Sequence, residues 1–159
     1  MKLPAVRSEA ERVPAFAEWF SDLPGAETTW QCIHCGLCSA SCPFSPYMDK
    51  TPRRLMHLAR EGFKKEVLES ATIWLCTSCY SCQERCPQGV SITDIMTLLK
   101  NLAVKEGHAP AGVKAQMDLI REHGRIYPLD DFDNKKRKKI DLPQLPTSCE
   151  VIKKLFKEE

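Results

Sequence analysis

The sequence predicts an all-α protein built on an internal repeat. Apolar residues recur at helical spacing in several segments, and no alternating strand pattern of useful length occurs among the 159 residues. A run that contains four cysteines and ends in proline occurs twice, over Cys32–Pro43 and Cys76–Pro87, at an offset of 44 residues. The same offset relates apolar residues downstream of the runs: Leu55, Leu58 and Ala59 recur as Leu99, Leu102 and Ala103. The predicted architecture is therefore a pseudo-twofold repeat of a loop plus a helix.

Helix signals lie before and between the two runs. The first predicted helix begins near Pro14, since proline would break an established helix, and it ends at Pro24-Gly25. Thr51-Pro52 is typical of a helix start, and Gly62 fits the end of the same helix. A shorter helix is expected over Lys64–Ser70, so two helices occupy the interval between the runs.

The strongest helix signal follows the second run. Ser91 has the spacing to Asp94 of a helix N-terminus, and a broad apolar face continues from there to Gly107. A further amphipathic helix is predicted to begin at Pro110 and to stop at Gly124. The longest helix of the chain is thus expected directly after the second run.

These patterns divide the chain into three parts. Residues 1–29 are predicted to form an N-terminal extension with a helix, residues 30–124 the repeat domain, and residues 125–159 a tail. The tail carries a basic run, Lys135–Lys139, and a possible short helix over Ser148–Phe156. We expect the basic run to be solvated, with docking to an acidic partner as the alternative.

The two cysteine runs predict iron–sulfur clusters. Both have the form C-x2-C-x2-C-x3-C-P, by which bacterial-type ferredoxins hold cubane clusters. Structural zinc sites favour paired C-x2-C knuckles at longer separations, and a chain without an export signal is expected to keep its thiols reduced. Two [4Fe-4S] clusters are therefore the preferred interpretation, with zinc or disulfides as alternatives.

The fourth cysteine of each run is expected to serve the cluster of the other run, as in two-cluster ferredoxins. The spacing then assigns the ligands to two sets: Cys32, Cys35, Cys38 and Cys86 hold one cluster, and Cys76, Cys79, Cys82 and Cys42 hold the other. This exchange predicts that folding and metal loading are coupled. The sequence offers no place for a substrate to react, so we predict electron conduction and no catalytic residue.

Composition and charge limit the remaining classes. With 43% hydrophobic and 28% charged residues the chain is typical of soluble proteins, and no apolar stretch approaches the ~18 residues of a membrane-spanning helix. The N-terminus lacks the apolar region of a secretory signal, so a cytoplasmic location is expected. The formal charge of +2 counts every cysteine as a thiol. Eight thiolates and two cores of about +2 each bring it to roughly −2, which removes the argument for nucleic-acid binding.

Four residues outside the predicted ligand sets have roles that can be weighed. Cys149 stands outside both runs, and we expect a free thiol near a helix start in preference to a ligand. His34 lies inside the first run, where we expect a solvent-facing loop residue, with tuning of the cluster or proton coupling as the alternative. Trp30 and Trp74, which are related by the offset of 44, are expected to shield the clusters from water.

The residues around the runs resemble a known family. Trp30-Gln31-Cys32 leads into the first run, Trp74-Leu75-Cys76 into the second, and Gly89-Val90 opens the long helix that follows. In these features the chain is similar to the C-type iron–sulfur subunit of heterodisulfide reductase and its bacterial homologues, over roughly residues 14–124. Related modules occur in the iron–sulfur subunits of succinate dehydrogenase, fumarate reductase and glycolate oxidase.

The resemblance implies an alpha-helical ferredoxin-like dicluster domain with two [4Fe-4S] clusters. It also implies an electron relay between two partner subunits, the flavin-containing A-type and the catalytic B-type, in which this chain is not catalytic alone. The sequence has no C-x4-C-x2-C segment for a two-iron cluster, which a succinate dehydrogenase subunit would carry ahead of this module. It also has none of the Cys-Cys-Gly motifs of the catalytic partner, so we expect the catalytic chemistry to belong to a separate chain. A free dicluster ferredoxin, or the iron–sulfur subunit of a succinate dehydrogenase or glycolate oxidase type enzyme, is the alternative.

Overall fold

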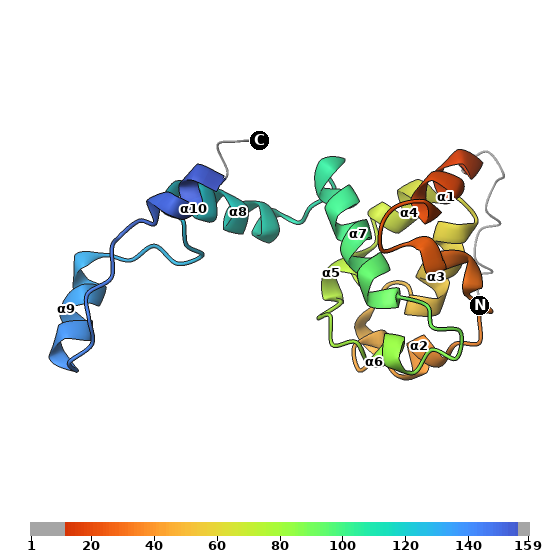
Figure 1. Ribbon diagram of the computed structural model, residues 1–159, viewed down its shortest axis with the longest axis horizontal. Helices are drawn as coiled ribbons and strands as arrows, with labels where there is room; N and C mark the ends of the chain where they lie inside the picture. The colour runs from red at the N-terminus through yellow and green to blue at the C-terminus, as the bar shows by residue number, and fades with distance from the viewer. Residues whose placement is uncertain (1–11, 156–159) are drawn as a thin grey trace, which may run out of the picture. The chain divides into compact units, whose positions relative to one another are not determined.

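The computed structural model describes residues 12–155, and within them every regular element is a helix (Figure 1). The all-α prediction is confirmed. The chain divides into two compact units between His108 and Ala109. The helix predicted after Pro110 therefore groups with the C-terminal segment, and the domain boundaries expected from the sequence stay a prediction. Residues 1–11 of the predicted extension and Phe156 of the last predicted helix lie outside the described residues.

The first unit contains the two cysteine runs and most of the predicted helices. Its elements are α1 (Pro14–Ser21), η2 (Glu27–Gln31), α2 (Leu37–Ala40), η3 (Ser45–Tyr47), α3 (Pro52–Arg60), α4 (Lys64–Leu68), α5 (Ala71–Leu75), α6 (Ser81–Glu84) and α7 (Ile92–Lys105). The starts of α1, α3, α4 and α7 agree with the sequence signals. Helix α5 was not predicted; it begins where the Ser70 hydroxyl caps the backbone N–H of Thr72.

The core of the first unit lies between α1, α3, α4 and α7. The apolar residues related by the offset of 44 supply much of it: Leu55, Leu58, Ala59, Leu99 and Ala103 are fully buried, and Leu102 packs against them. Phe20 from α1 and Ile95 from α7 are also fully buried. Each run is thus followed by a helix that presents the same apolar positions to one shared core. The twofold relation between complete halves stays a prediction.

The chain enters α1 beside the turn that ends α3. The backbone N–H of Val13 donates to the carbonyl oxygen of Gly62 at 2.8 Å, and Arg12 pairs with Glu61 at 3.1 Å. Gly62 has a left-handed backbone with φ of +80°, and a Cβ atom there would lie 2.6 Å from the Val13 carbonyl oxygen. Both the turn and the close approach require glycine at this position.

The second unit holds three helices, α8 (Ala111–His123), α9 (Asp131–Lys139) and α10 (Glu150–Leu155). Helices α8 and α10 pack together, and the Cys149 N–H donates to the carbonyl oxygen of His123 at 3.0 Å. Cys149 carries a free thiol immediately before α10, as expected. Within residues 12–155, no helix combines the length and the apolarity needed to cross a bilayer.

Helix α9 includes the basic run, for which the sequence analysis proposed no helix. It is started by a capping box, in which Asp130 accepts from the Asp133 N–H at 2.8 Å and the Asp133 carboxylate accepts from the Asp130 N–H. The basic residues occupy the last turn, where their charge is favourable to the helix dipole. Lys136 lies over the Phe132 ring at 4.3 Å, which gives part of the run a partner within its own helix.

A pair of glycine substitutions tests the contact between α1 and the end of α3. Gly107→Ala is the control, because Gly107 has a similar φ of +81° and no atom lies within 4 Å of the position that a Cβ atom would take. It should lower the free energy of unfolding only by the cost of the left-handed backbone, about 1–2 kcal/mol. Gly62→Ala adds the clash with Val13 and should lower the urea midpoint of the cluster-loaded protein further. Unfolding is followed by loss of visible cluster absorbance. Equal midpoints for the two variants would contradict the close approach.

Candidate iron–sulfur cluster site

The two cysteine loops share their backbone conformation. His34 and Ser78 both have positive φ, 56° and 54°, and Gly36 and Tyr80 both take the left-handed conformation directly before α2 and α6. These positions differ by 44 residues, as do the bounds of the two short helices. Left-handed residues reverse the chain between successive cysteines, which lets a short loop bend around one object. The sequence repeat is therefore a repeat of local structure.

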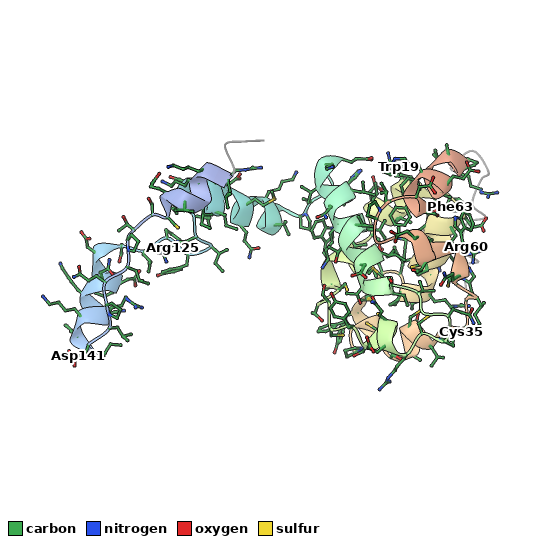
Figure 2. The ribbon with its side chains drawn as sticks, in the orientation of Figure 1. Trp19, Cys35, Arg60, Phe63, Arg125 and Asp141 are labelled. Atoms are coloured by element: carbon green, nitrogen blue, oxygen red, sulfur yellow. The ribbon has the colours of Figure 1, made fainter. Side chains whose placement is uncertain are left out.

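The exposure of the cysteines also follows the repeat. Cys35 and Cys79, the second of each run, are exposed, whereas the third is buried in the first run (Cys38) and half-buried in the second (Cys82). The first and fourth cysteines of both runs are half-buried. Cys35 lies at the end of the unit that holds α2 and α6 (Figure 2). Each loop thus presents one sulfur to solvent and keeps the others inside.

The eight cysteines gather around two separate hollows. One hollow contains about 330 Å³ of space free of atoms and the other about 400 Å³. The first is lined by Cys32, Cys35, Cys38 and Cys86, and the second by Cys42, Cys76, Cys79 and Cys82. Each set joins three cysteines of one run to the fourth cysteine of the other. These are the sets that the spacing assigned as ligands, and the assignment itself stays a prediction.

The remaining walls of the hollows suit a metal–sulfur cluster. The first hollow is closed by apolar residues such as Leu37, Val90 and Ile92, and the second by Met48 and Met96. Four soft thiolate donors in an apolar enclosure match the chemistry that iron–sulfur clusters require. A cubane also distributes its ligands over four irons, so the sulfurs need not converge on one point. The residues present therefore fit the group.

Protonation of the metal-free thiols differs with position. Burial raises the pKa of Cys38 to about 11, and burial also raises the pKa of Cys82. A hydrogen bond with Ser81, whose oxygen lies 3.6 Å from the sulfur, lowers the pKa of the exposed Cys79. The inner cysteines are thus neutral before metal binds, and cluster loading must displace their protons.

A cation from the following long helix secures the start of each loop. Arg60 of α3 donates to the carbonyl oxygen of Cys32, and Lys100 of α7 donates to that of Cys76 at 2.8 Å. Arg60, labelled in Figure 2, also lies over the Trp30 ring at 5.2 Å. Charge-assisted hydrogen bonds of this kind fix the backbone direction of the first cysteine in each run.

His34 differs from the expected solvent-facing loop residue. It is half-buried, its Nε2 lies 3.1 Å from the Arg60 guanidinium, and its ring meets that of His57 edge-on at 5.1 Å. Burial, together with the positive groups Arg60, His57 and Arg53, lowers the pKa of His34. His34 therefore faces solvent only in part, because the loop folds back onto α3, a contact between segments that loop composition does not encode. Trp30 is half exposed, so it shields the first loop only in part.

Asp49 was missed by the sequence analysis, although it joins the two halves of the unit. Its carboxylate accepts from the Ser70 hydroxyl at 2.8 Å, from the Thr72 N–H and hydroxyl at 2.9 Å, and from Lys50 at 2.8 Å. Burial opposes its ionisation, but the four hydrogen bonds outweigh burial and hold the pKa of Asp49 well below its ordinary value. The contact anchors α5, which leads directly into Cys76. No spacing rule relates position 49 to position 70, so the sequence carried no signal for it.

Comparisons with known proteins agree with this geometry. A 4Fe-4S dicluster domain matches residues 29–90, which include both runs. The C-type subunit of a ferredoxin:CoB-CoM heterodisulfide reductase from Methanosarcina mazei is 37% identical over 127 residues, which cover 80% of this chain and 78% of the relative. The corresponding protein from Methanosarcina acetivorans is 39% identical, covering 75% and 73%, and that from Methanothermobacter marburgensis is 34% identical, covering 84% and 72%.

The chain belongs to the family of C-type subunits of heterodisulfide reductase. As a member of this family it is an iron–sulfur electron-transfer subunit with two [4Fe-4S] clusters. All nine cysteines lie within residues 12–155, and no disulfide joins any of them. The eight cysteines of the runs all fall inside the matched dicluster domain.

Replacement of Asp49 tests its anchoring role. Asp49→Asn removes the charge that accepts four hydrogen bonds and should cost about 1–2 kcal/mol, a figure reduced for solvent screening because the side chain is 39% exposed. The measurement is the urea midpoint of the cluster-loaded protein at neutral pH. Since the folded pKa is depressed, the contribution is present above the ordinary value of 3.8 and is lost as pH falls. Asp118→Asn, at an exposed carboxylate 3.5 Å from Arg121, is the control that should leave the midpoint unchanged.

Proposed function

We propose that this protein relays electrons between two partner subunits of a heterodisulfide-reductase-like complex, the flavin-containing A-type and the catalytic, Cys-Cys-Gly-containing B-type. The observation that carries the proposal is the convergence of three cysteines of one run with the fourth of the other around each hollow. When bound, the clusters supply one-electron redox chemistry. The chain's own residues hold the clusters close together in one unit, because each set includes a cysteine from the opposite loop.

The second cysteine of each run is exposed, which supports a relay in which a partner can approach each cluster. Cys35 borders the first hollow and Cys79 the second, and both are exposed, so each hollow has one sulfur that a partner can approach. The names of the relatives include both ferredoxin and H(2) as reaction partners of CoB-CoM heterodisulfide reductases. A relay chain suits such variation, since its donor and its catalytic acceptor are separate proteins. A cytoplasmic location is part of this proposal, in keeping with eight thiols reserved for metal.

Purification of the native complex tests the relay. Tagged protein isolated anaerobically from its own cells should elute in size-exclusion chromatography with larger chains, one of which binds flavin. Iron and sulfide analysis should give about eight of each per chain. Elution as a lone monomer near 18.0 kDa would favour a free dicluster ferredoxin and contradict the relay function within a complex.

The proposed ligand sets make a prediction about one cysteine of the first run. Cys42→Ala should damage the cluster held by Cys76, Cys79 and Cys82, since Cys42 lines the second hollow. Iron content should fall toward about half, and the EPR signal that remains should belong to the cluster of the first hollow. Cys149→Ala is the matched control and should keep both clusters. Selective loss of the first cluster in Cys42→Ala would refute the exchange.

A further inference from the structure

The two hollows differ in the charge around them. The second is lined by four cysteines together with hydroxyl, aromatic, thioether and proline side chains, and no charged side chain contributes to it. The first is lined by His34 and Arg53 in addition to its cysteines. These same two residues also line a neighbouring open hollow, in which the space free of atoms, open solvent included, is about 1020 Å³. The open hollow thus shares two residues, both with basic side chains, with the first cluster site, and it shares only Met48 with the second.

The neighbouring hollow is strongly basic. It is bordered by a set of residues that we name the basic face: His34, Lys50, Arg53, Arg54 and His57. Three of them, Arg53, Arg54 and His57, lie on α3 and are exposed to solvent. Lys50 pairs with Asp49, so the positive charge of this patch comes from the guanidinium groups of Arg53 and Arg54, on a holoprotein whose net charge is roughly −2.

The one acidic residue of this hollow does not neutralise the arginines. Asp49 already accepts hydrogen bonds from Lys50, Ser70 and Thr72. The ion pairs formed among residues 12–155 include neither Arg53 nor Arg54. The positive charge of α3 at this face is consequently available to a partner.

An apolar area lies around the exposed cysteine of the same loop. Cys35 is flanked by Ile33 and Leu37, which are 59% and 43% exposed. A small apolar contact beside a charged rim is the usual composition of an interface between proteins that associate briefly. The apolar contact favours a protein partner, because a nucleic acid or a lipid headgroup would gain little from the aliphatic side chains beside Cys35.

We propose that the basic face, together with Ile33, Leu37 and Cys35, is the docking surface for an acidic redox protein that exchanges electrons with the first cluster. The inference rests on the proposed relay function and deepens it by assigning one of the two partners to the first cluster. The second hollow has no charged side chain in its lining, and Tyr80 and Phe44 are exposed beside it, so it suits a partner with a neutral surface. Because the surfaces beside the two hollows differ in charge, a partner that suits one surface is disfavoured at the other.

Small redox reagents of opposite charge test the basic face without any partner protein. Reduced holoprotein is mixed in a stopped-flow instrument with tris(oxalato)cobaltate(III), a trianion, or with tris(ethylenediamine)cobalt(III), a trication. Each cobalt(III) accepts one electron from a reduced cluster and becomes cobalt(II), while that cluster is oxidised by one electron. Arg54→Glu is the chosen variant, because Arg54 borders the basic face and is outside both cysteine-lined hollows.

The expected result is a selective loss for the anion. At low salt Arg54→Glu should slow oxidation by the trianion by about threefold to tenfold and should not slow oxidation by the trication. The difference should vanish at ~1 M salt, where the Debye length is about 3 Å. Arg54→Gln should show a smaller loss, and iron content equal to the wild type verifies that each variant is loaded.

Lys65→Glu in α4 is the matched control, since it makes the same change of charge at an exposed residue of the same unit that borders none of the three hollows. It should leave the trianion rate unchanged. An equal effect of Lys65→Glu, or no effect of Arg54→Glu, would overturn the proposal. Because the assay uses the chain alone, its result is independent of whether the native protein is isolated within a larger complex.

Discussion

The exchange of the fourth cysteine between the two loops is the constraint on which the first unit depends. Cys42 lies beside the second run and Cys86 beside the first, so neither hollow is complete without the other half of the unit. Short loops cannot form a core of their own, and the chain satisfies the exchange by placing α3 and α7 against one shared core. Because the same segments supply the core and the cysteines, we expect packing and metal binding to be coupled.

The loops are held from their inner side by a small number of polar contacts. Arg60 and Lys100 bind the carbonyl oxygens of the first cysteines, and Asp49 binds the start of the helix that leads into the second run. Each contact joins segments that are more than 20 residues apart. These contacts fix the direction in which each loop extends from the core. The residues with left-handed backbone then bend the chain around the hollow.

The repeat of local structure does not make the two cysteine-lined hollows equivalent. Backbone angles and the exposed second cysteine correspond at an offset of 44, but the lining of the first hollow includes Arg53 and His34, where that of the second has hydroxyl and aromatic groups. The cationic side chains beside the first hollow belong to α3 and to the loop before it. For the proposed relay, this difference in charge around the two hollows would favour a different partner at each cluster.

The sequence by itself determined the helical class, the starts of α1, α3 and α7, and the two groups of cysteines that surround the hollows. These features follow from local rules: proline and serine mark helix starts, apolar periodicity marks faces, and ligand spacing is limited by the reach of a short loop. The tertiary structure alone decided the placement of His34 against Arg60, the contact of Asp49 with α5, and the gathering of cations beside the first hollow. Those arrangements join side chains from segments far apart in the chain, and their positions depend on how the helices pack, which local spacing does not encode.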